Sequence, residues 1–232
     1  MSQAGKERSD QKLKSLQSMV AEAFEHLSKK YPDLRRRKAT LLLGRHYAHP
    51  RSRVLMLGLN PGLDEELPLD LECQKENSLL GDPGDTEIAY WRNARRLFAT
   101  TPRLSAVLEY ATFSFCCPFR TPSWSSLSSA QRRDLIEESM PTLARILEDC
   151  RPEFVIAAGR TAQRILTDRL RPPPQVKSRS RRAKGPIYSW ERLDLQWRHL
   201  DFAVLQIPHL SRANSAKKLR ECGLWLDRNL AA

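Results

Sequence analysis

Residues 54–62 read "VLMLGLNPG", and this stretch decides the fold. Its apolar part is short and uninterrupted, which is typical of a strand that is buried on both faces of a parallel sheet. Pro61 and Gly62 then turn the chain away from the sheet. Asn60 is therefore expected at the carboxyl end of a buried strand, which is where sheets flanked by helices bind their ligands.

Three further apolar runs have the same character: "ATFSFCC" from residue 111, "EFVIAAG" from 153 and "DFAVLQI" from 201. Helical patterns separate the runs, at roughly 86–99, 129–150, 160–170 and 215–230. Ser128 and Gln131 form a capping-box pattern at the start of the second helix. This alternation predicts an α/β fold, a three-layer α/β/α sandwich around a four-stranded parallel sheet with right-handed crossovers.

Length and composition set the broad class of the protein. The 232 residues fit one main domain, predicted at 39–232, preceded by an N-terminal helical extension at 1–38. No apolar run approaches the roughly 18 residues that span a bilayer, and the polar N-terminus lacks the apolar core of a secretory signal. We expect a cytoplasmic protein that acts as a monomer and does not enter membranes.

The five cysteines form no C-x-x-C pair, and their number is odd. This argues against a zinc ribbon and against a disulfide framework, and favours buried free thiols. The sequence therefore predicts no metal site and no cofactor.

Charge is strongly positive and unevenly distributed. The formal net charge of +12 favours a polyanionic partner, with nucleic acid preferred over a membrane surface. Residues 171–184 hold six Lys or Arg and no carboxylate, which is typical of a mobile loop lying along phosphates. A second basic cluster comprises Lys29, Lys30 and residues 35–38. The alternative for both clusters is an ordinary solvated surface.

Residues 64–87 have the opposite bias, with nine Asp or Glu and a single lysine, Lys75. An acidic loop is unusual in a protein that binds DNA. The alternative interpretation is a solvated insertion without a role in binding.

The last predicted strand also ends in polar residues, because "VLQIPHLSRANS" places Pro208, His209 and Ser211 after it. Since the carboxyl ends of parallel strands meet at one edge of a sheet, Asn60 and His209 are expected to face the same crevice. Taken singly, Asn60 could be a turn former and His209 an ordinary loop histidine.

Together these motifs resemble those of the uracil-DNA glycosylase superfamily, in particular its single-strand-selective monofunctional and mismatch-specific branches. "GLNPG" at 58–62 is similar to the first motif, G-[MI]-N-P-G, and "HLSR" at 209–212 to the second, H-P-S-P, with Leu210 in place of proline. The segments "IAYWRNARRLF", "CCPFRTPSWSSLSSAQ" and "FVIAAGRTAQRIL" also resemble family segments. The resemblance covers about residues 50–225.

The resemblance implies hydrolysis of the N-glycosidic bond of a base in DNA, without a lysine nucleophile. The transition state is an oxocarbenium-like sugar with an anionic leaving base. Asn60 would hold the attacking water, and His209 would donate a hydrogen bond to the base carbonyl as negative charge develops there. The residues expected around the flipped base are Gly58, Pro61, Gly62, Asp64 and Phe115.

The base must leave the duplex before it can react, and a side chain must fill the gap. Leu210, Ser211 and Arg212 are expected to form this wedge with its adjacent charge. Arg179, Arg181, Arg182 and Lys184 are the expected phosphate contacts. Tyr90 or Trp91 could stack on the base or face the core, and the sequence does not decide between them.

One departure from the family bears on the substrate. The uracil-excising branch has an asparagine before L-C-P that reads the pyrimidine edge, and Phe115 stands there in this chain. Loss of that amide predicts poor uracil discrimination unless Ser114 or another residue substitutes. Together with the acidic stretch it favours a substituted cytosine of viral DNA, and hence a defence role. The alternatives are excision of uracil or a damaged pyrimidine in repair, a nucleoside hydrolase, and a non-catalytic nucleic-acid-binding module.

Overall fold

The computed structural model describes residues 3–33, 40–42, 47, 53–60, 72–74, 89–121, 123–183, 189–213 and 215–231. Within them a six-stranded sheet has the strand order β4-β2-β5-β8-β7-β6. The strands are β2 (Val54–Gly58), β4 (Thr112–Phe115), β5 (Phe154–Ala158), β6 (Gln175–Ala183), β7 (Ser189–Trp197) and β8 (Leu200–Ile207). A separate parallel pair joins β1 (Thr40–Leu42) to β3 (Glu72–Gln74).

The four predicted strands are confirmed as β2, β4, β5 and β8, and they pair in parallel. The predicted sheet of four strands is wrong in number, because β6 and β7 extend it as antiparallel strands. The segment 171–184, predicted to be a mobile loop, contains the whole of the edge strand β6 at residues 175–183. The side chains of residues 175–180 are exposed, so no apolar alternation marked this strand in the sequence.

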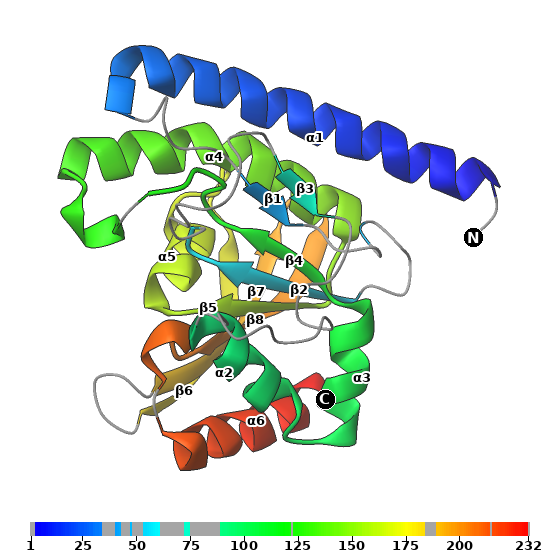
Figure 1. Cartoon of the computed structure of the whole chain (residues 1–232). Helices are drawn as coiled ribbons and strands as arrows, with labels where there is room; N and C mark the ends of the chain where they lie inside the picture. The colour runs from blue at the N-terminus through cyan, green and yellow to red at the C-terminus, as the bar shows by residue number, and fades with distance from the viewer. Residues whose placement is uncertain are drawn as a thin grey trace.

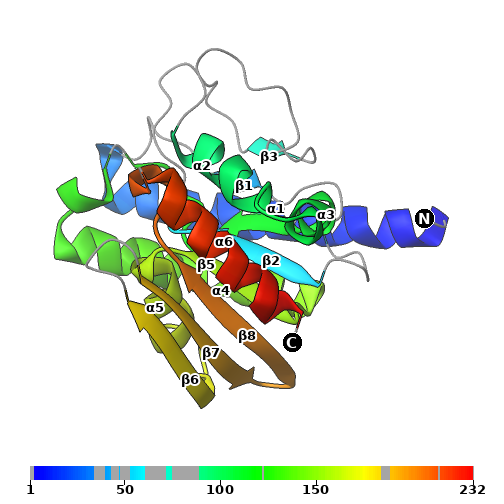
Figure 2. The same ribbon diagram turned by 90° about the horizontal axis from the view of Figure 1, so that it is seen from below.

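Helices cover both faces of the sheet (Figure 1). One face carries α1 (Gln3–Lys30), α4 (Ser129–Cys150) and α5 (Arg160–Asp168), and the other carries α2 (Ala89–Phe98), α3 (Pro102–Tyr110) and α6 (Ala216–Leu230). The capping box at Ser128 and Gln131 is present at the start of α4. The view from below in Figure 2 shows α2 and α6 together over the sheet.

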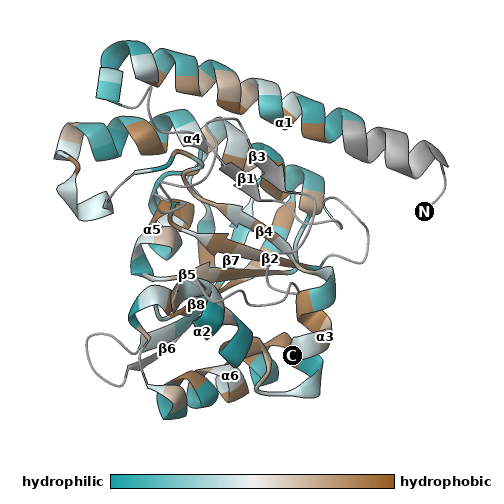
Figure 3. Cartoon of the chain, in the orientation of Figure 1, coloured by the Kyte–Doolittle hydropathy of each residue, from teal (hydrophilic) through white to brown (hydrophobic). Residues whose placement is uncertain are grey.

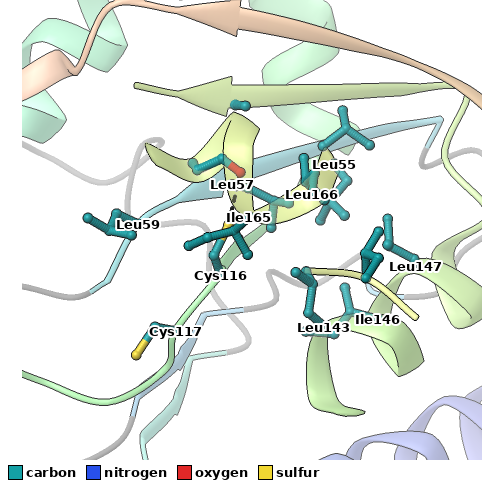
Figure 4. Close-up of a cluster of buried hydrophobic side chains, with 14 of the residues drawn as sticks. Leu55, Leu57, Leu59, Cys116, Cys117, Leu143, Ile146, Leu147, Ile165 and Leu166 are labelled. Atoms are coloured by element: carbon teal, nitrogen blue, oxygen red, sulfur yellow. Dashed lines mark hydrogen bonds between the residues drawn. The ribbon is translucent and has the colours of Figure 1, made fainter. Parts of the chain in front are cut away.

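The core is divided by the sheet into two apolar layers, which appear as the brown interior of Figure 3. Leu55 and Leu57 of β2 pack with α4 and α5 residues in the first layer (Figure 4). Met56 alternates to the opposite face and joins the layer under α2, α3 and α6. The predicted buried thiols are confirmed for Cys116, Cys117, Cys150 and Cys222.

The N-terminal helix α1 belongs to the same packed body as the sheet. Its residues Leu16, Val20 and Leu27 are almost fully buried in the first layer. Lys30 and Tyr31 both donate hydrogen bonds to the Asp134 carboxylate of α4. Among the described helices, none is long and apolar enough to cross a membrane.

Candidate active site

Asn60 lies two residues beyond the end of β2, at the carboxyl edge of the parallel strands. Cys116 N–H and Cys117 N–H donate to the carbonyls of Gly58 and Leu59, each at 2.9 Å, so the pairing of β2 with β4 continues past both strands. This brings the segment after β4 beside Asn60, whose Nδ2 donates to Thr121 Oγ1 at 2.9 Å. Thr121 is only 1% exposed, so the amide of Asn60 is held against a rigid partner.

His209 follows β8 and is partly buried. Its ring packs on Gly159, where an added Cβ would lie 3.2 Å from His209 Cδ2. Gly159 also has a φ of 100°, a conformation that favours glycine, so a side chain is excluded there for two reasons. The ring of Tyr90 meets the imidazole edge to face, with centroids 6.1 Å apart. These contacts fix the plane of the imidazole.

The electrostatic setting of His209 favours the neutral imidazole. Burial lowers the pKa of His209 below its ordinary value, and the positive charge of Arg212 lowers this pKa further. His209 Nδ1 lies 2.7 Å from Ser211 Oγ. If the Ser211 hydroxyl donates this hydrogen bond, the imidazole carries its proton on Nε2, where it can donate to a ligand.

The loop that carries His209 is anchored from α2. Asn93 is buried in α2, and its Nδ2 donates to the carbonyl of Leu210 at 2.7 Å. Leu210, predicted to be a wedge for the DNA gap, is 0% exposed and belongs to the core layer beneath α2 and α6. The structure thus contradicts this prediction for Leu210, while Ser211 and Arg212 are exposed beside it. The side chain of Leu210 is buried because it is apolar and because Asn93 holds the carbonyl of the same residue.

Phe115 and Tyr90 lie over Gly58. A Cβ at Gly58 would come within 2.8 Å of Phe115 Cδ1 and 3.3 Å of the Tyr90 hydroxyl, so glycine is required for this close approach. Burial raises the pKa of Tyr90, which keeps its hydroxyl protonated at neutral pH. Strand alternation places Ser114 on the opposite face of β4 from Phe115, so Ser114 does not replace the missing amide.

The other predicted site residues are only partly placed. Pro61, Gly62, Asp64 and Lys184 lie outside the described residues, as does the acidic stretch 64–87 except for residues 72–74. Arg181 and Arg182 belong to β6, but their side chains lie outside the described parts. Arg179 Nε is 2.6 Å from Glu191 Oε1, a carboxylate that is buried in β7. Arg179 is therefore already engaged by the protein.

The arrangement brings Asn60 and His209 to one edge of the sheet. Because β2 and β8 both flank β5, their ends are about 10 Å apart at roughly 4.8 Å per strand. Among the described residues, no group of three or more His, Cys, Asp or Glu is placed to hold a metal ion.

Three residues that hold this site were not predicted from the sequence: Thr121, Asn93 and Gly159. Thr121 stands in "RTPSW" and Asn93 in "YWRNARR", both within segments that resemble family segments. Their partners come from distant parts of the chain, so the pairing had no local signal.

Residues 46–229 match the family model described as the Uracil DNA glycosylase superfamily. The match spans more than half of the chain, so the protein belongs to this superfamily. A search of curated proteins gave no significant match.

Proposed function

We propose that this member of the uracil-DNA glycosylase superfamily is a monofunctional DNA glycosylase that flips a base and hydrolyses its N-glycosidic bond, leaving an abasic site. The placement of Asn60 and His209 at two strand ends that flank β5 carries this proposal. Membership supports it as well, since members of the superfamily are DNA glycosylases.

Asn60 and His209 have different roles on the two sides of the scissile bond, Asn60 at the sugar and His209 at the base. Asn60 is not a strong base, but with Nδ2 donating to Thr121 its Oδ1 is the atom that accepts from a water. That water attacks the anomeric carbon as the glycosidic bond breaks and loses one proton to solvent, while the bonding electron pair leaves with the base, which then takes up a proton. A neutral His209 stabilises the departing anion by a hydrogen bond from Nε2.

For the substrate we propose a substituted cytosine of viral DNA, excised in the cytoplasm as a defence. Phe115 supports this choice, because its ring occupies the space above Gly58 and offers stacking without edge readout. The nine carboxylates of residues 64–87 support it as well, since carboxylates bind hydroxyl or amine substituents and repel phosphate.

The alternative substrate is uracil or a damaged pyrimidine, and the alternative of another class is a nucleic-acid-binding module without activity. A panel of duplex and single-stranded oligonucleotides, each with one candidate base, is treated with protein and then alkali. Strand cleavage at a cytosine with a hydroxylated or sugar substituent is expected. Cleavage at uracil alone would establish the repair alternative, and no cleavage with tight binding would favour the binding module.

The acidic stretch has its own test. Replacing Asp64, Glu65 and Glu66 with Asn, Gln and Gln should slow release of the substituted cytosine while plain pyrimidines are unaffected, because only the substituent has groups for these carboxylates. Equal loss on both substrates would assign the stretch a structural role.

A further inference from the structure

The two cations of β6 whose side chains the structure describes, Lys177 and Arg179, both form ion pairs with neighbouring carboxylates. Lys177 Nζ lies 2.6 Å from Asp201 Oδ1, and Arg179 Nε lies 2.6 Å from the buried Glu191. Gln163 of α5 also donates to Glu191, which fixes this carboxylate in place. Such paired cations release few counterions on binding a polyanion, because the protein already supplies the counter-charge.

Helix α2 presents exposed cations and has no carboxylate of its own. It buries Asn93, Ala94, Leu97 and Phe98 against the core. Its opposite side exposes Arg92 and Arg96, one helical turn apart. The ten residues of α2 contain no carboxylate, so this face is uniformly basic.

The neighbouring segment, from the short 3-10 helix η3 (Leu210–Arg212) into α6, continues the same charge. Arg212, Lys217 and Arg220 are exposed, and residues 210–220 contain no carboxylate. None of these three side chains, and neither Arg92 nor Arg96, makes an ion pair within the part of the chain that the structure describes.

The two segments form one surface. Asn93 of α2 holds the carbonyl of Leu210 in η3. At the far end of α2, Thr100 meets Gly223 of α6 so closely that an added Cβ there would lie 2.4 Å from Thr100 Oγ1. Since α2 packs on η3 at one end and on α6 at the other, the outward sides of these elements adjoin (Figure 2).

This basic surface begins at the candidate active site. Tyr90, in the first turn of α2, contacts His209, and the charge of Arg212 reaches the His209 imidazole. If one nucleotide of a DNA strand occupies the site, the phosphates of the next nucleotides lie beside the site. The cations that adjoin the site there belong to α2, η3 and α6.

We infer that Arg92, Arg96, Arg212, Lys217 and Arg220 form the phosphate-binding surface for the DNA strand that flanks the flipped nucleotide. The inference rests on the proposed function, and it assigns phosphate contacts to α2, η3 and α6 in addition to those predicted on the β6 segment. Arginine suits this role because its guanidinium pairs with phosphate oxygens through two parallel hydrogen bonds.

The test measures binding of a fluorescent 25-base-pair duplex of ordinary bases over a series of salt concentrations. The variant carries Arg92→Ala, Arg96→Ala and Arg220→Ala together, since alanine preserves the helices and the outward side chains support no core contact. Affinity falls as salt rises, and the steepness of log affinity against log salt should decrease by about 2 to 3. This corresponds to roughly 0.9 for each phosphate that the protein no longer neutralises.

The matched control removes the same charge elsewhere, with Lys14→Ala, Arg164→Ala and Arg169→Ala. All three are exposed, on α1 or at α5, over the opposite face of the sheet. The control should keep the slope of the wild-type protein. An equal fall in both variants would overturn the inference, because it would show that only total charge matters.

Failure of the inference and failure of the proposed function give different results. Base release by the wild-type protein together with an unchanged slope in the α2–α6 variant would overturn the surface and leave the glycosylase standing. A reduced slope in that variant without release of any base from the oligonucleotide panel would support the surface and overturn the activity.

Discussion

The side-chain amide of Asn60 donates a 2.9 Å hydrogen bond to Thr121 Oγ1, which ties the end of β2 to the segment that follows β4. The bond engages one N–H of the amide and so fixes which way its oxygen is directed. A side chain that orients one water needs this restraint, because loss of position removes most of its catalytic effect. Both partners of the bond can be tested by substitution.

Asn60→Ala should slow base release by about 100-fold or more, because the group that orients the water is removed. Folding and DNA affinity should stay near those of the wild-type protein. Single-turnover kinetics measure the rate of base release, thermal unfolding measures stability, and duplex binding measures DNA affinity. A wild-type rate in this variant would remove Asn60 from the mechanism.

Thr121→Val keeps the shape of the side chain and removes the acceptor for Asn60. Base release should slow by about 2- to 10-fold, the value of one ordinary hydrogen bond of roughly 0.5 to 1.5 kcal/mol. Thr121→Ser should restore the rate, since it returns the hydroxyl. Loss of rate in both variants to the same extent would show that packing, and not the hydrogen bond, is what Thr121 supplies.

The pKa of His209 should rise in Arg212→Ala, because the cation that disfavours the imidazolium is removed while the burial remains. In the wild-type protein the depressed pKa keeps His209 neutral at pH 7, and protonation sets in only as the pH falls below its ordinary value of about 6.5. A proton NMR titration of the imidazole measures both values. Arg220→Ala, farther along α6, serves as the control and should leave the titration unchanged.

Asn93→Leu should destabilise the protein by about 0.5 to 1.5 kcal/mol, because the carbonyl of Leu210 loses its shorter hydrogen bond and keeps only the one from Ala213 N–H at 3.3 Å. Base release should also fall, since the hydrogen bond from Asn93 holds the loop carrying His209. Denaturant unfolding and single-turnover rates measure the two effects, with Arg96→Ala on the exposed side of α2 as the stability control. A loss of stability with a full rate would restrict Asn93 to a structural role.

Phe115→Asn should shift activity toward uracil by roughly 1 to 3 kcal/mol, the value of a paired polar contact with a base edge. Phe115→Leu removes the ring without adding an amide, so it should weaken release of the substituted cytosine and gain nothing on uracil. Rates on both substrates are compared for the two variants. A gain on uracil in both would show that space above Gly58, and not the amide, controls the choice.

The sequence predicted the four parallel strands of the sheet well, because β2, β4, β5 and β8 are almost entirely buried and consist of apolar runs. The strand β7 was missed although Leu193, Leu195 and Trp197 alternate toward the core, since polar residues stand between them. The strand β6 gave no signal, because backbone pairing with β7 holds it and its side chains at 175–180 are exposed.

The positions of Asn60 and His209 could be predicted, because each residue follows directly from the end of a strand. The site was not predictable where a side chain could turn either way. Leu210 was assigned to the DNA interface because it follows His209, yet its apolar side chain gains more from the core under α2. The ion pair of Arg179 with Glu191 could likewise not be predicted, because Glu191 belongs to β7, a strand that was not predicted from the sequence.

The edge strand β6 bears on how the protein behaves when it is concentrated. Within the described residues β6 pairs only with β7, so its other side presents backbone groups that could accept a strand from a second copy. Lys177 and Arg179 stand exposed along this edge. Two such edges brought together would bury these charged side chains and their ion pairs with Asp201 and Glu191, so the charges along β6 disfavour edge-to-edge aggregation.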